Sequence, residues 1–595
     1  MSSQGAPADF LGVQHSLTGR RWRMRDADPR VVRDIKLRHG LSEPLARALA
    51  SRGVTVETSD QFLNPTLKAL FPDPSTFADM DRAASLLIDA IEDGRNTVVF
   101  ADYDVDGATS AALLVRWFRA MGRELTIYVP DRELEGYGPT PAVFRKLKAA
   151  GADLVITVDC GAAAEIALNA AAEIALPVVV VDHHMMRATP PPAAALVNPN
   201  RADCLSGQGN LAAAGVVFVL LAALNRESRR RGLFANRPEP DLRQWLDLAA
   251  LGAICDVTAL TGFNRALTAQ GLKVLSGWRN PGVKALAEIA GATGEATTFH
   301  AGFILGPRIN AGGRIGRADV GARLLSTDDP AEAATLAAEL DGFNDLRKQI
   351  EADTQLEAEH QLGAFPNAPV LIATGEGWRP GVVGIVAGRL RERFRRPVIV
   401  IGVDPQTGIG KGSGRSQPGV NLGRAVQAAF DAGLLMSGGG HAMAAGLTIA
   451  ADRIDALSTF LNAMLEAETT QATLDDAVEI DALITPGAAD RAMLNDFGRL
   501  APFGPGNPEP AFALAGVRPI RAMAMRGGHV RCDLSDSRGQ RIKAIAWRAA
   551  ETPLGQRLLA GESSLNVVGR LKPDDWNGRE GVQLEIEDVA DPRQV

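Results

Sequence analysis

The chain lacks the sequence marks of a membrane, secreted or zinc-finger protein. None of its apolar runs reaches the roughly 18 residues that a membrane-spanning helix needs. Its first residues, MSSQGAPADFLGVQ, contain neither the basic start nor the apolar stretch of a signal peptide. The four cysteines are scattered without a CxxC pair, so neither a disulfide framework nor a thiolate zinc site is indicated. We therefore expect a cytoplasmic protein with reduced thiols and no membrane partner.

The bulk composition is that of a folded, multidomain protein. At 595 residues the chain is too long for one hydrophobic core, since domains average about 150 residues. Hydrophobic residues make up 46% and charged residues 22%, which is far from the composition of disordered chains. The net charge of −7 argues against a nonspecific nucleic-acid coat. Between Glu376 and Arg424, however, nine basic residues face only three acidic ones, which predicts a local positive surface.

Short β-branched runs alternate with helical segments from Thr97 onward. The runs TVVFAD, LTIYVP, DLVITVD and PVVVVD are separated by helices expected over 108–121, 140–150 and 162–175. Four apolar strands that alternate with helices predict an α/β domain with a parallel, doubly wound sheet.

The rest of the chain changes character several times. A polar helix is expected over 330–363, a second α/β unit opens with APVLIATG, and the tail has short alternating segments such as IKAIAW and VQLEIE. Asn577-Gly578 is a hairpin signal in that tail, and a small β-barrel is the fold expected of it. We expect five parts: an N-terminal extension (1–75), the first α/β domain (76–325), a connecting helix (326–365), a second α/β domain (366–465) and the barrel (470–595).

Charged side chains follow the carboxyl ends of the four strands, where open α/β sheets bind ligands. The first strand is followed by DYDVDG, the second by Arg132, the third by Asp159 and the fourth by Asp182-His183-His184. Neighbouring strands lie about 4.8 Å apart, so these groups come within reach of one another, and the carboxylates, left alone, repel. A divalent cation removes that cost. An oxygen-rich shell with one or two imidazoles suits a pair of Mn²⁺ or Mg²⁺ ions that activate water for hydrolysis.

Each of these residues also has an ordinary structural interpretation. A single aspartate at a strand end is usually a helix cap or a turn residue. That interpretation explains poorly the whole set of two overlapping D-x-D steps, an aspartate at another strand end and a DHH triplet. Asp256 ends the apolar run LAALGAIC, and it either caps the next segment or is carried back toward the sheet.

The ordered motifs resemble a known family. DYDVDG, TVDCG, DHH and CDV together are similar to the signature of the DHH phosphoesterase superfamily. Five further motifs, VPDRELEGYG, GPRINAGGRIGRA, GKGSGRS, GGGHAMAAG and PFGPGNPEP, resemble the RecJ family of single-strand-specific exonucleases within it. The resemblance covers about residues 80 to 595.

The resemblance implies roles for the residues of the site. The implied ligands are Asp104 and Asp159 for one ion, and Asp106, Asp159, His183 and Asp256 for the other, with Asp159 bridging. His184 is implied to face the phosphate and to form the catalytic set with Asp106 and Asp159. The superfamily often has a histidine where this chain has Phe100, so Asp102 is an alternative ligand of the first ion.

The later domains resemble those that hold substrate in this family. The second α/β unit resembles the DHH-associated domain, in which glycine-rich segments offer backbone N–H groups to a phosphate. The resemblance implies Ser413 and Arg415, helped by Arg132 and Arg308, as contacts of a 5′-terminal phosphate, and His441 in the glycine-rich GGGH adds a further charge. The tail resembles an OB-fold that stacks bases on aromatic side chains. Trp547 and Trp576 are available for this, although each is equally well explained as a core residue.

The resemblance implies a 5′-to-3′ exonuclease that releases nucleoside 5′-monophosphates from single-stranded DNA in repair and recombination. We expect it to act as a monomer, with a helicase and a single-strand-binding protein as partners. Two alternatives remain open. One is a DHH phosphodiesterase for oligoribonucleotides or cyclic dinucleotides, against which the tail and the N-terminal extension argue. The other is a non-enzymatic binder of single strands, against which the five intact ligands argue.

Overall fold

The chain folds into two compact units. A computed structural model of the protein describes residues 9–132, 135–363, 367–561, 563–574 and 581–592, so Trp576 and Asn577-Gly578 lie outside the described residues. One unit spans Leu70–Leu474, and the other combines Met1–Ala69 with Asp475–Val595. The five-part division expected from the sequence stays a prediction. Within the described ranges, no helix combines the length and apolar character needed to cross a membrane.

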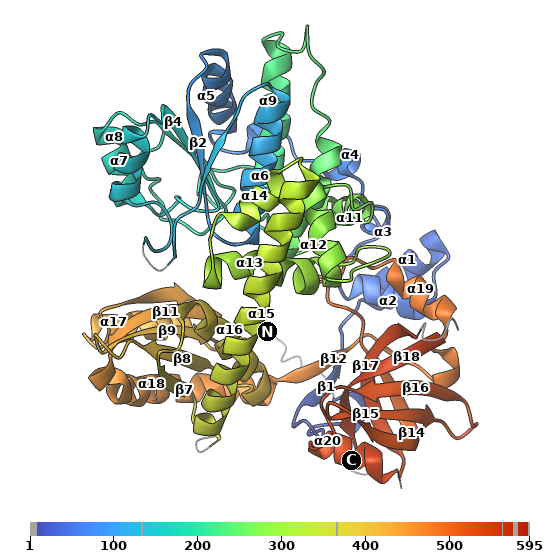
Figure 1. Ribbon diagram of the computed structural model, residues 1–595. Coiled ribbons are helices and arrows are strands. Elements are labelled where there is room, and N and C mark those ends of the chain that lie inside the picture. Colours follow the sequence, from blue (N-terminus) through green and yellow to red (C-terminus); the bar gives the residue numbers. More distant parts are fainter. Residues whose placement is uncertain (1–8, 133–134, 364–366, 562, 575–580, 593–595) are drawn as a thin grey trace, which may run out of the picture. The chain divides into compact units, whose positions relative to one another are not determined.

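A five-stranded parallel sheet forms the first part of the larger unit (Figure 1). Its strands, in spatial order, are β3 (Thr126–Tyr128), β2 (Thr97–Ala101), β4 (Leu154–Val158), β5 (Val178–Val181) and β6 (Ala195–Val197). The sequence predicted the first four, and β6 is an additional strand. The register is level at the carboxyl ends, where Ala101 pairs with Val158, Val158 with Val181 and Val181 with Val197. The residues that follow β2, β4, β5 and β6 therefore lie on one line across the sheet.

Helices cover both faces of this sheet, which confirms the doubly wound α/β prediction (Figure 1). Helices α7 (Pro141–Ala149) and α8 (Glu165–Glu173) pack on the face where Phe100 and Phe144 share a buried cluster. Helices α5 (Met80–Glu92), α6 (Val105–Ala120) and α9 (Ala213–Arg230) contact β6, β2 and β5. Every residue of β2, β4 and β5 is buried. That is why these strands are apolar except at Thr97 and Thr157 and do not alternate.

The long polar helix α15 (Pro330–Leu362) connects the two parts of this unit. It begins after Asp329, whose carboxylate accepts a hydrogen bond from the Ala331 N–H. An ion pair of 2.8 Å joins Asp341 to Arg308 on one side, and Glu357 accepts a 2.9 Å hydrogen bond from Trp378 on the other. The helices between α9 and α15 are α10 (Leu246–Cys255), α11 (Gly262–Leu275), α12 (Pro281–Ile289), the π-helix η4 (His300–Leu305), α13 (Gly306–Ile315) and α14 (Val320–Ser326).

A second five-stranded sheet completes the larger unit. In spatial order it consists of β10 (Ser437–His441), β11 (Ala444–Ala450), β9 (Ile409–Arg415), β8 (Val398–Val403) and β7 (Leu371–Glu376). Only β7 and β8 are parallel. The sheet lies between two hydrophobic clusters, one with α16 (Pro380–Phe394) and α15, the other with α17 (Leu422–Asp431) and α18 (Ile454–Asp475).

The smaller unit is built from both ends of the chain. Its sheet has the order β13-β14-β15-β16-β18-β17, and because β14 also pairs with β17 the sheet curls on itself. Strand β1 pairs in parallel with β12, and buried Trp22 donates a 2.9 Å hydrogen bond to buried Asp588. The strands and helices of this unit are β1 (Arg21–Met24), α1 (Pro29–His39), α2 (Glu43–Ala50), α3 (Ser59–Leu63), β12 (Ala477–Ile480), β13 (Ala482–Leu483), α19 (Arg491–Gly498), β14 (Phe512–Met525), β15 (His529–Ser535), β16 (Arg541–Ala546), α20 (Pro553–Ala560), β17 (Leu565–Asp574) and β18 (Gly581–Ala590).

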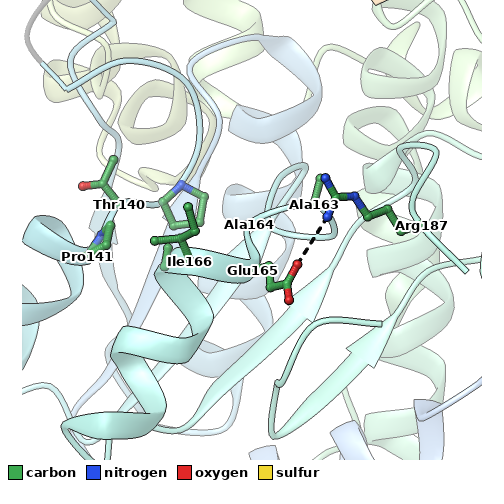
Figure 2. A pocket seen from close by; sticks show the side chains of 9 residues that line it. Thr140, Pro141, Ala163, Ala164, Glu165, Ile166 and Arg187 are labelled. Atoms are coloured by element: carbon green, nitrogen blue, oxygen red, sulfur yellow. Dashed lines mark hydrogen bonds and ion pairs between the residues drawn. The ribbon is translucent and has the colours of Figure 1, made fainter. Parts of the chain in front are cut away.

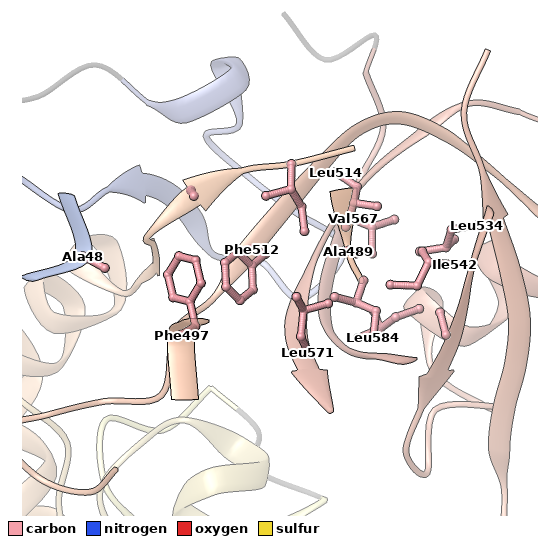
Figure 3. Close-up of a cluster of buried hydrophobic side chains, with 14 of the residues drawn as sticks. Ala48, Ala489, Phe497, Phe512, Leu514, Leu534, Ile542, Val567, Leu571 and Leu584 are labelled. Atoms are coloured by element: carbon pink, nitrogen blue, oxygen red, sulfur yellow. The ribbon is translucent and has the colours of Figure 1, made fainter. Parts of the chain in front are cut away.

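One hydrophobic core joins these distant segments. Figure 3 shows Phe497 and Phe512 beside Ala48 of α2 and the barrel side chains around Leu514 and Leu584. The rings of Phe497 and Phe512 meet edge to face at 4.8 Å. Helices α1 and α2 therefore fold as part of the C-terminal sheet's core.

Candidate active site

The predicted acidic residues stand where the strands of the first sheet end. Asp102 follows β2, Asp159 follows β4 and Asp182 follows β5. Their backbone N–H groups continue the sheet, as in the 3.0 Å bond from Asp159 to the carbonyl of Val181. Asp104 caps α6, because its carboxylate accepts hydrogen bonds from the N–H groups of Asp106 and Gly107. Helix α6 thus begins at Val105, three residues earlier than expected.

The imidazole of His183 lies among three carboxylates. Its Nε2 is 3.3 Å from Asp159, 3.5 Å from Asp256 and 3.8 Å from Asp106. Asp256 ends α10 and does not cap the following helix, whose N-cap is Thr261. The apolar run of α10 therefore carries Asp256 back toward the sheet.

A second group of carboxylates lies next to the first. One oxygen each of Asp102, Asp104 and Asp159 lies within 4.8 Å of the others. Because Asp159 belongs to both groups, the five predicted ligands form one continuous cluster with Asp102 as an additional member.

The chemistry of this cluster fits divalent cations. Among the described residues, Oδ1 of Asp102, Oδ1 of Asp159 and Nε2 of His183 are buried without a hydrogen-bond partner. Burial, followed by repulsion from the neighbouring carboxylates, raises the pKa of Asp106 and of Asp159 well above its usual range. Burial lowers the pKa of His183 to about 4, so its ring is neutral at pH 7. A neutral imidazole among oxygen donors is a donor set that suits Mn²⁺ or Mg²⁺.

Asp182 is different, because it is fully engaged within the protein. One carboxylate oxygen accepts hydrogen bonds from the backbone of His183 (2.7 Å) and from Nδ1 of His184 (2.8 Å). The other accepts the N–H of Ala162 at 2.9 Å. Burial opposes protonation of His184, but the hydrogen bond and the charge of Asp182 outweigh it and raise the pKa of His184 to about 9. Asp182 therefore holds the ring of His184 in place.

A cavity of about 350 Å³ adjoins the carboxylates and contains three arginines. It is lined by Asp102, Tyr103, Asp104, Arg132, Tyr137, His184, Arg314, Pro380, Gly384, Ser413 and Arg415. Arg415 donates a 3.0 Å hydrogen bond to the Ser413 hydroxyl, and Arg314 donates one of 3.0 Å to the carbonyl of Gly381. Burial and then the charge of Arg132 lower the pKa of Arg314 to about 10. Guanidinium groups gathered in this way form a site for an anion such as phosphate.

The structure brings together most, but not all, of the predicted substrate contacts. Arg132, Ser413 and Arg415 line the cavity, whereas Arg308 and His441 do not. Arg308 is held by Asp341 and by the carbonyl of Ile304. His441 is exposed, and Ala444 separates it from Arg415 across the strands.

Three polar side chains of the cavity were not predicted from the sequence. Arg314 lies in the same motif as Arg308 but six residues further along α13, and so on a different face of that helix. Tyr103 lies under Arg132, at 5.1 Å from ring centroid to guanidinium. The Tyr137 hydroxyl is 3.4 Å from Nε2 of His184. The motifs DYDVDG, VPDRELEGYG and GPRINAGGRIGRA contained these three residues, but nothing in them indicated which side chains face the cavity.

A second hollow, of about 420 Å³, lies at the first turns of α7 and α8 (Figure 2). It is lined by small and apolar side chains such as Pro141 and Ile166, with a 3.5 Å ion pair between Arg187 and Glu165 at its edge. None of the acid and imidazole clusters found among the described residues lies in it. The chemistry therefore belongs to the arginine-lined cavity, although that cavity is the smaller of the two.

Comparison with known proteins agrees with this geometry. Three family models match the chain in order: the DHH family, N-terminal domain (residues 96–253), the DHHA1 domain (367–467) and the RecJ OB domain (480–588). The single-stranded-DNA-specific exonuclease RecJ of Dickeya dadantii (strain 3937) is 35% identical over 586 residues, which cover 94% of this chain and 98% of that protein. The chain belongs to the RecJ family. RecJ of Escherichia coli (strain K12) is likewise 35% identical, over 91% of this chain and 92% of that protein.

A solved RecJ structure has the same fold. RecJ from Thermus thermophilus in complex with Mn²⁺ matches with a TM-score of 0.80 and 31% identity, over 96% of this chain and 80% of that one. The same protein is also known in complex with Mg²⁺. The RecJ resemblance and the DHHA1 and OB-type domains are thereby confirmed.

Proposed function

We propose that this chain is a 5′-to-3′ exonuclease specific for single-stranded DNA, which releases nucleoside 5′-monophosphates with the help of two divalent cations. One observation carries the proposal: a single cavity is lined both by carboxylates and by three arginines with Ser413. Such a cavity can hold a terminal phosphate beside the phosphodiester to be cut. The names of the RecJ relatives as single-stranded-DNA-specific exonucleases support the substrate.

In this proposal the two ions share Asp159. The proposed ligands are Asp106, Asp159, His183 and Asp256 for one ion, and Asp104, Asp159 and Asp102 for the other. Asp102 is supported by its burial at 5% exposure and by its unpartnered oxygen. Phe100 supplies no ligand, because a phenyl ring has no donor atom, and it stacks on Tyr128 at 5.6 Å. When bound, the two cations supply Lewis acidity toward the scissile phosphate and lower the pKa of a water molecule.

The side chains around the ions orient the substrate. Asp182 occupies Nδ1 of His184, and His184 lines the cavity, so its Nε2–H can donate to a phosphate oxygen on which negative charge develops. Arg132, Arg314 and Arg415 hold the 5′-phosphate through charge-assisted hydrogen bonds. A cavity of about 350 Å³ is the size of a small-ligand pocket, which suits removal of one terminal nucleotide at a time.

The cellular setting forms part of the same proposal. The chain acts in DNA repair and recombination as a cytoplasmic monomer. Its substrate strands are opened by a helicase and covered by a single-strand-binding protein. The RecJ OB domain match over residues 480–588 supports a role for the smaller unit in binding the strand.

Digestion of a labelled strand tests the proposal. A 5′-phosphorylated, 3′-labelled single strand and the matching duplex are incubated with and without Mn²⁺. We expect Mn²⁺-dependent shortening from the 5′ end, with the 3′ label released last and the duplex resistant. Early release of the label as a mononucleotide would contradict the polarity, and equal digestion of the duplex would contradict the strand specificity. No digestion at any Mn²⁺ concentration would end the proposal.

A further inference from the structure

Two asparagines at the end of β6 hold the backbone of the DHH triplet. Asn198 directly follows β6 and is completely buried. Its Nδ2 donates a 2.9 Å hydrogen bond to the carbonyl of His184, and its Oδ1 accepts a 2.8 Å bond from the N–H of Asn200. Asn200 in turn donates from Nδ2 to the carbonyl of His183 at 2.5 Å. Each asparagine therefore binds the backbone of one histidine.

The contacts of Asn198 define its orientation. A reversed amide would place Oδ1 against the carbonyl oxygen of His184 and an NH₂ group against the N–H of Asn200, which is unfavourable on both sides. Asn200 is oriented in a similar way, because its Nδ2 also donates a 3.3 Å hydrogen bond to the carbonyl of Gly209.

Side-chain hydrogen bonds also hold strand β6 itself. Arg201 donates to the carbonyl of Leu196 at 2.5 Å and to Asp79 at 2.8 Å. Asp79 also accepts the N–H of Leu196 at 3.1 Å. The two asparagines thus extend from a strand whose end is tied to its surroundings.

We propose that Asn198 and Asn200 are positioning residues with separable roles: Asn200 aims His183 at the metal ions, and Asn198 aims His184 at the substrate phosphate. The inference rests on the proposed function of the site. Neither asparagine lines the cavity, so both act through the backbone of the histidines.

The hydrogen bonds of the triplet explain why the roles separate. Without Asn200, His184 is still held by Asp182 at two nitrogens and by Asn198 at its carbonyl. Among the described residues, the backbone of His183 then keeps only its 2.7 Å bond to Asp182, while its ring still bonds to the backbone of Leu211. Without Asn198, His183 keeps both Asp182 and Asn200, and the peptide that follows His184 loses its anchor. One substitution therefore disturbs mainly the ligand and the other mainly the phosphate-facing ring.

Titration of the metal-free protein with Mn²⁺, followed by single-turnover digestion of a 5′-phosphorylated single strand, separates the two roles. Groups that orient metal ligands typically contribute 10–100-fold to metal affinity or activity. For Asn200→Ala we expect Mn²⁺ affinity to fall by roughly 10–100-fold and the digestion rate to recover at saturating Mn²⁺. For Asn198→Ala we expect Mn²⁺ affinity close to that of the parent protein and a rate lower by roughly 10–100-fold at every Mn²⁺ concentration.

Asn96→Ala is the matched control. Asn96 makes the same kind of bond, from Nδ2 to the carbonyl of Gly151 at 2.9 Å. It lies at the amino end of β2, away from the site, and this variant should change neither quantity. Because Asn198 is buried, Asn198→Ser is a second variant: serine can still accept the N–H of Asn200 but cannot reach the carbonyl of His184.

Several outcomes overturn the inference. The inference fails if Asn200→Ala leaves the Mn²⁺ affinity unchanged. It also fails if the Asn198 and Asn200 variants lose Mn²⁺ affinity equally, or if Asn96→Ala loses as much Mn²⁺ affinity as Asn200→Ala. Thermal melts of each metal-free variant show whether a loss comes from unfolding. If Asn198→Ala is unfolded, the same measurements on Asn198→Ser decide the role of Asn198. Mn²⁺ titration needs no DNA, so it tests the role of Asn200 even if the chain digests no single strands. Hydrolysis of a simple phosphodiester such as bis(p-nitrophenyl) phosphate then tests Asn198.

Discussion

Replacing Arg314 with methionine should remove most of the preference for a 5′-phosphorylated end. Arg314 lines the cavity with Arg132 and Arg415, and burial with these like charges lowers its pKa from 12.5 to about 10. That shift corresponds to at most about 3 kcal/mol of unfavourable free energy in the charged form, which a bound phosphate would relieve. Because the side chain is only partly buried, we expect about 2 kcal/mol, or roughly a 30-fold effect.

The assay is the ratio of kcat/KM for one strand with a 5′-phosphate and with a 5′-hydroxyl. In Arg314→Met this ratio should fall roughly 30-fold, with the rate on the 5′-hydroxyl strand changed much less. Arg308→Met is the control, because Arg308 is equally an arginine of α13 but pairs with Asp341 outside the cavity. An unchanged ratio in Arg314→Met, or an equal fall in Arg308→Met, would refute the assignment of this cavity to the terminal phosphate.

Three further outcomes test other parts of the structure. In Asp256→Asn the metal-free protein should melt higher, because burial and the charge of Asp104 raise the pKa of Asp256 to about 7. Mn²⁺ should no longer raise the melting temperature of this variant. The expectation is contradicted if its melting temperatures in EDTA and in Mn²⁺ differ by as much as those of the parent protein. Burial raises the pKa of Asp247 from 3.8 to about 6, so its ionised form destabilises the fold at pH values above about 6 and not below about 4. Asp247→Asn should therefore gain up to about 3 kcal/mol at pH 7 and nothing at pH 4, and urea unfolding that shows the same gain at both pH values would disprove the buried charge. Arg52→Met removes the 2.7 Å partner of buried Asp481 and leaves it the longer 3.6 Å contact with Arg25, which should cost the smaller unit about 1.5–3 kcal/mol. Hydrogen exchange should then accelerate in β12 and β14 and not in β2 or β4, and uniform exchange throughout would argue against a local role.

Much of the first sheet was predictable because its central strands are buried on both faces. Strands β2, β4 and β5 are apolar at every position except Thr97 and Thr157, and each is followed directly by an aspartate, so both the sheet and the line of aspartates could be predicted from the sequence. Strand β6 has only three residues, Ala-Leu-Val, too few to show any periodicity. Because β6 was not predicted, nothing indicated that Asn198 follows the end of a strand. It lies on the same line as Asp102, Asp159 and Asp182.

The substrate side was harder to predict, since it depends on which face a helix presents. The π-helix η4 immediately precedes α13 and shifts the helical phase, so the motif alone did not distinguish Arg308 from Arg314. His441 was chosen for its glycine-rich context, but in β10 that segment is an edge strand whose histidine is exposed. Strand pairing between distant segments leaves no local signal at all, and nothing near Trp22 indicates that its strand pairs with β12.

That last pairing imposes an order on how the protein is made. Strand β1 leaves the ribosome early, while β12, its partner, ends at Ile480. At about 5–20 residues per second, translation leaves β1 waiting for roughly 20 to 90 s. During that time Trp22 has no Asp588 to bind, and the intervening α/β domains can fold ahead of it. A messenger RNA truncated before β12 would yield a polypeptide in which β1 has no partner strand and Trp22 is not buried. Cellular quality control recognises such features.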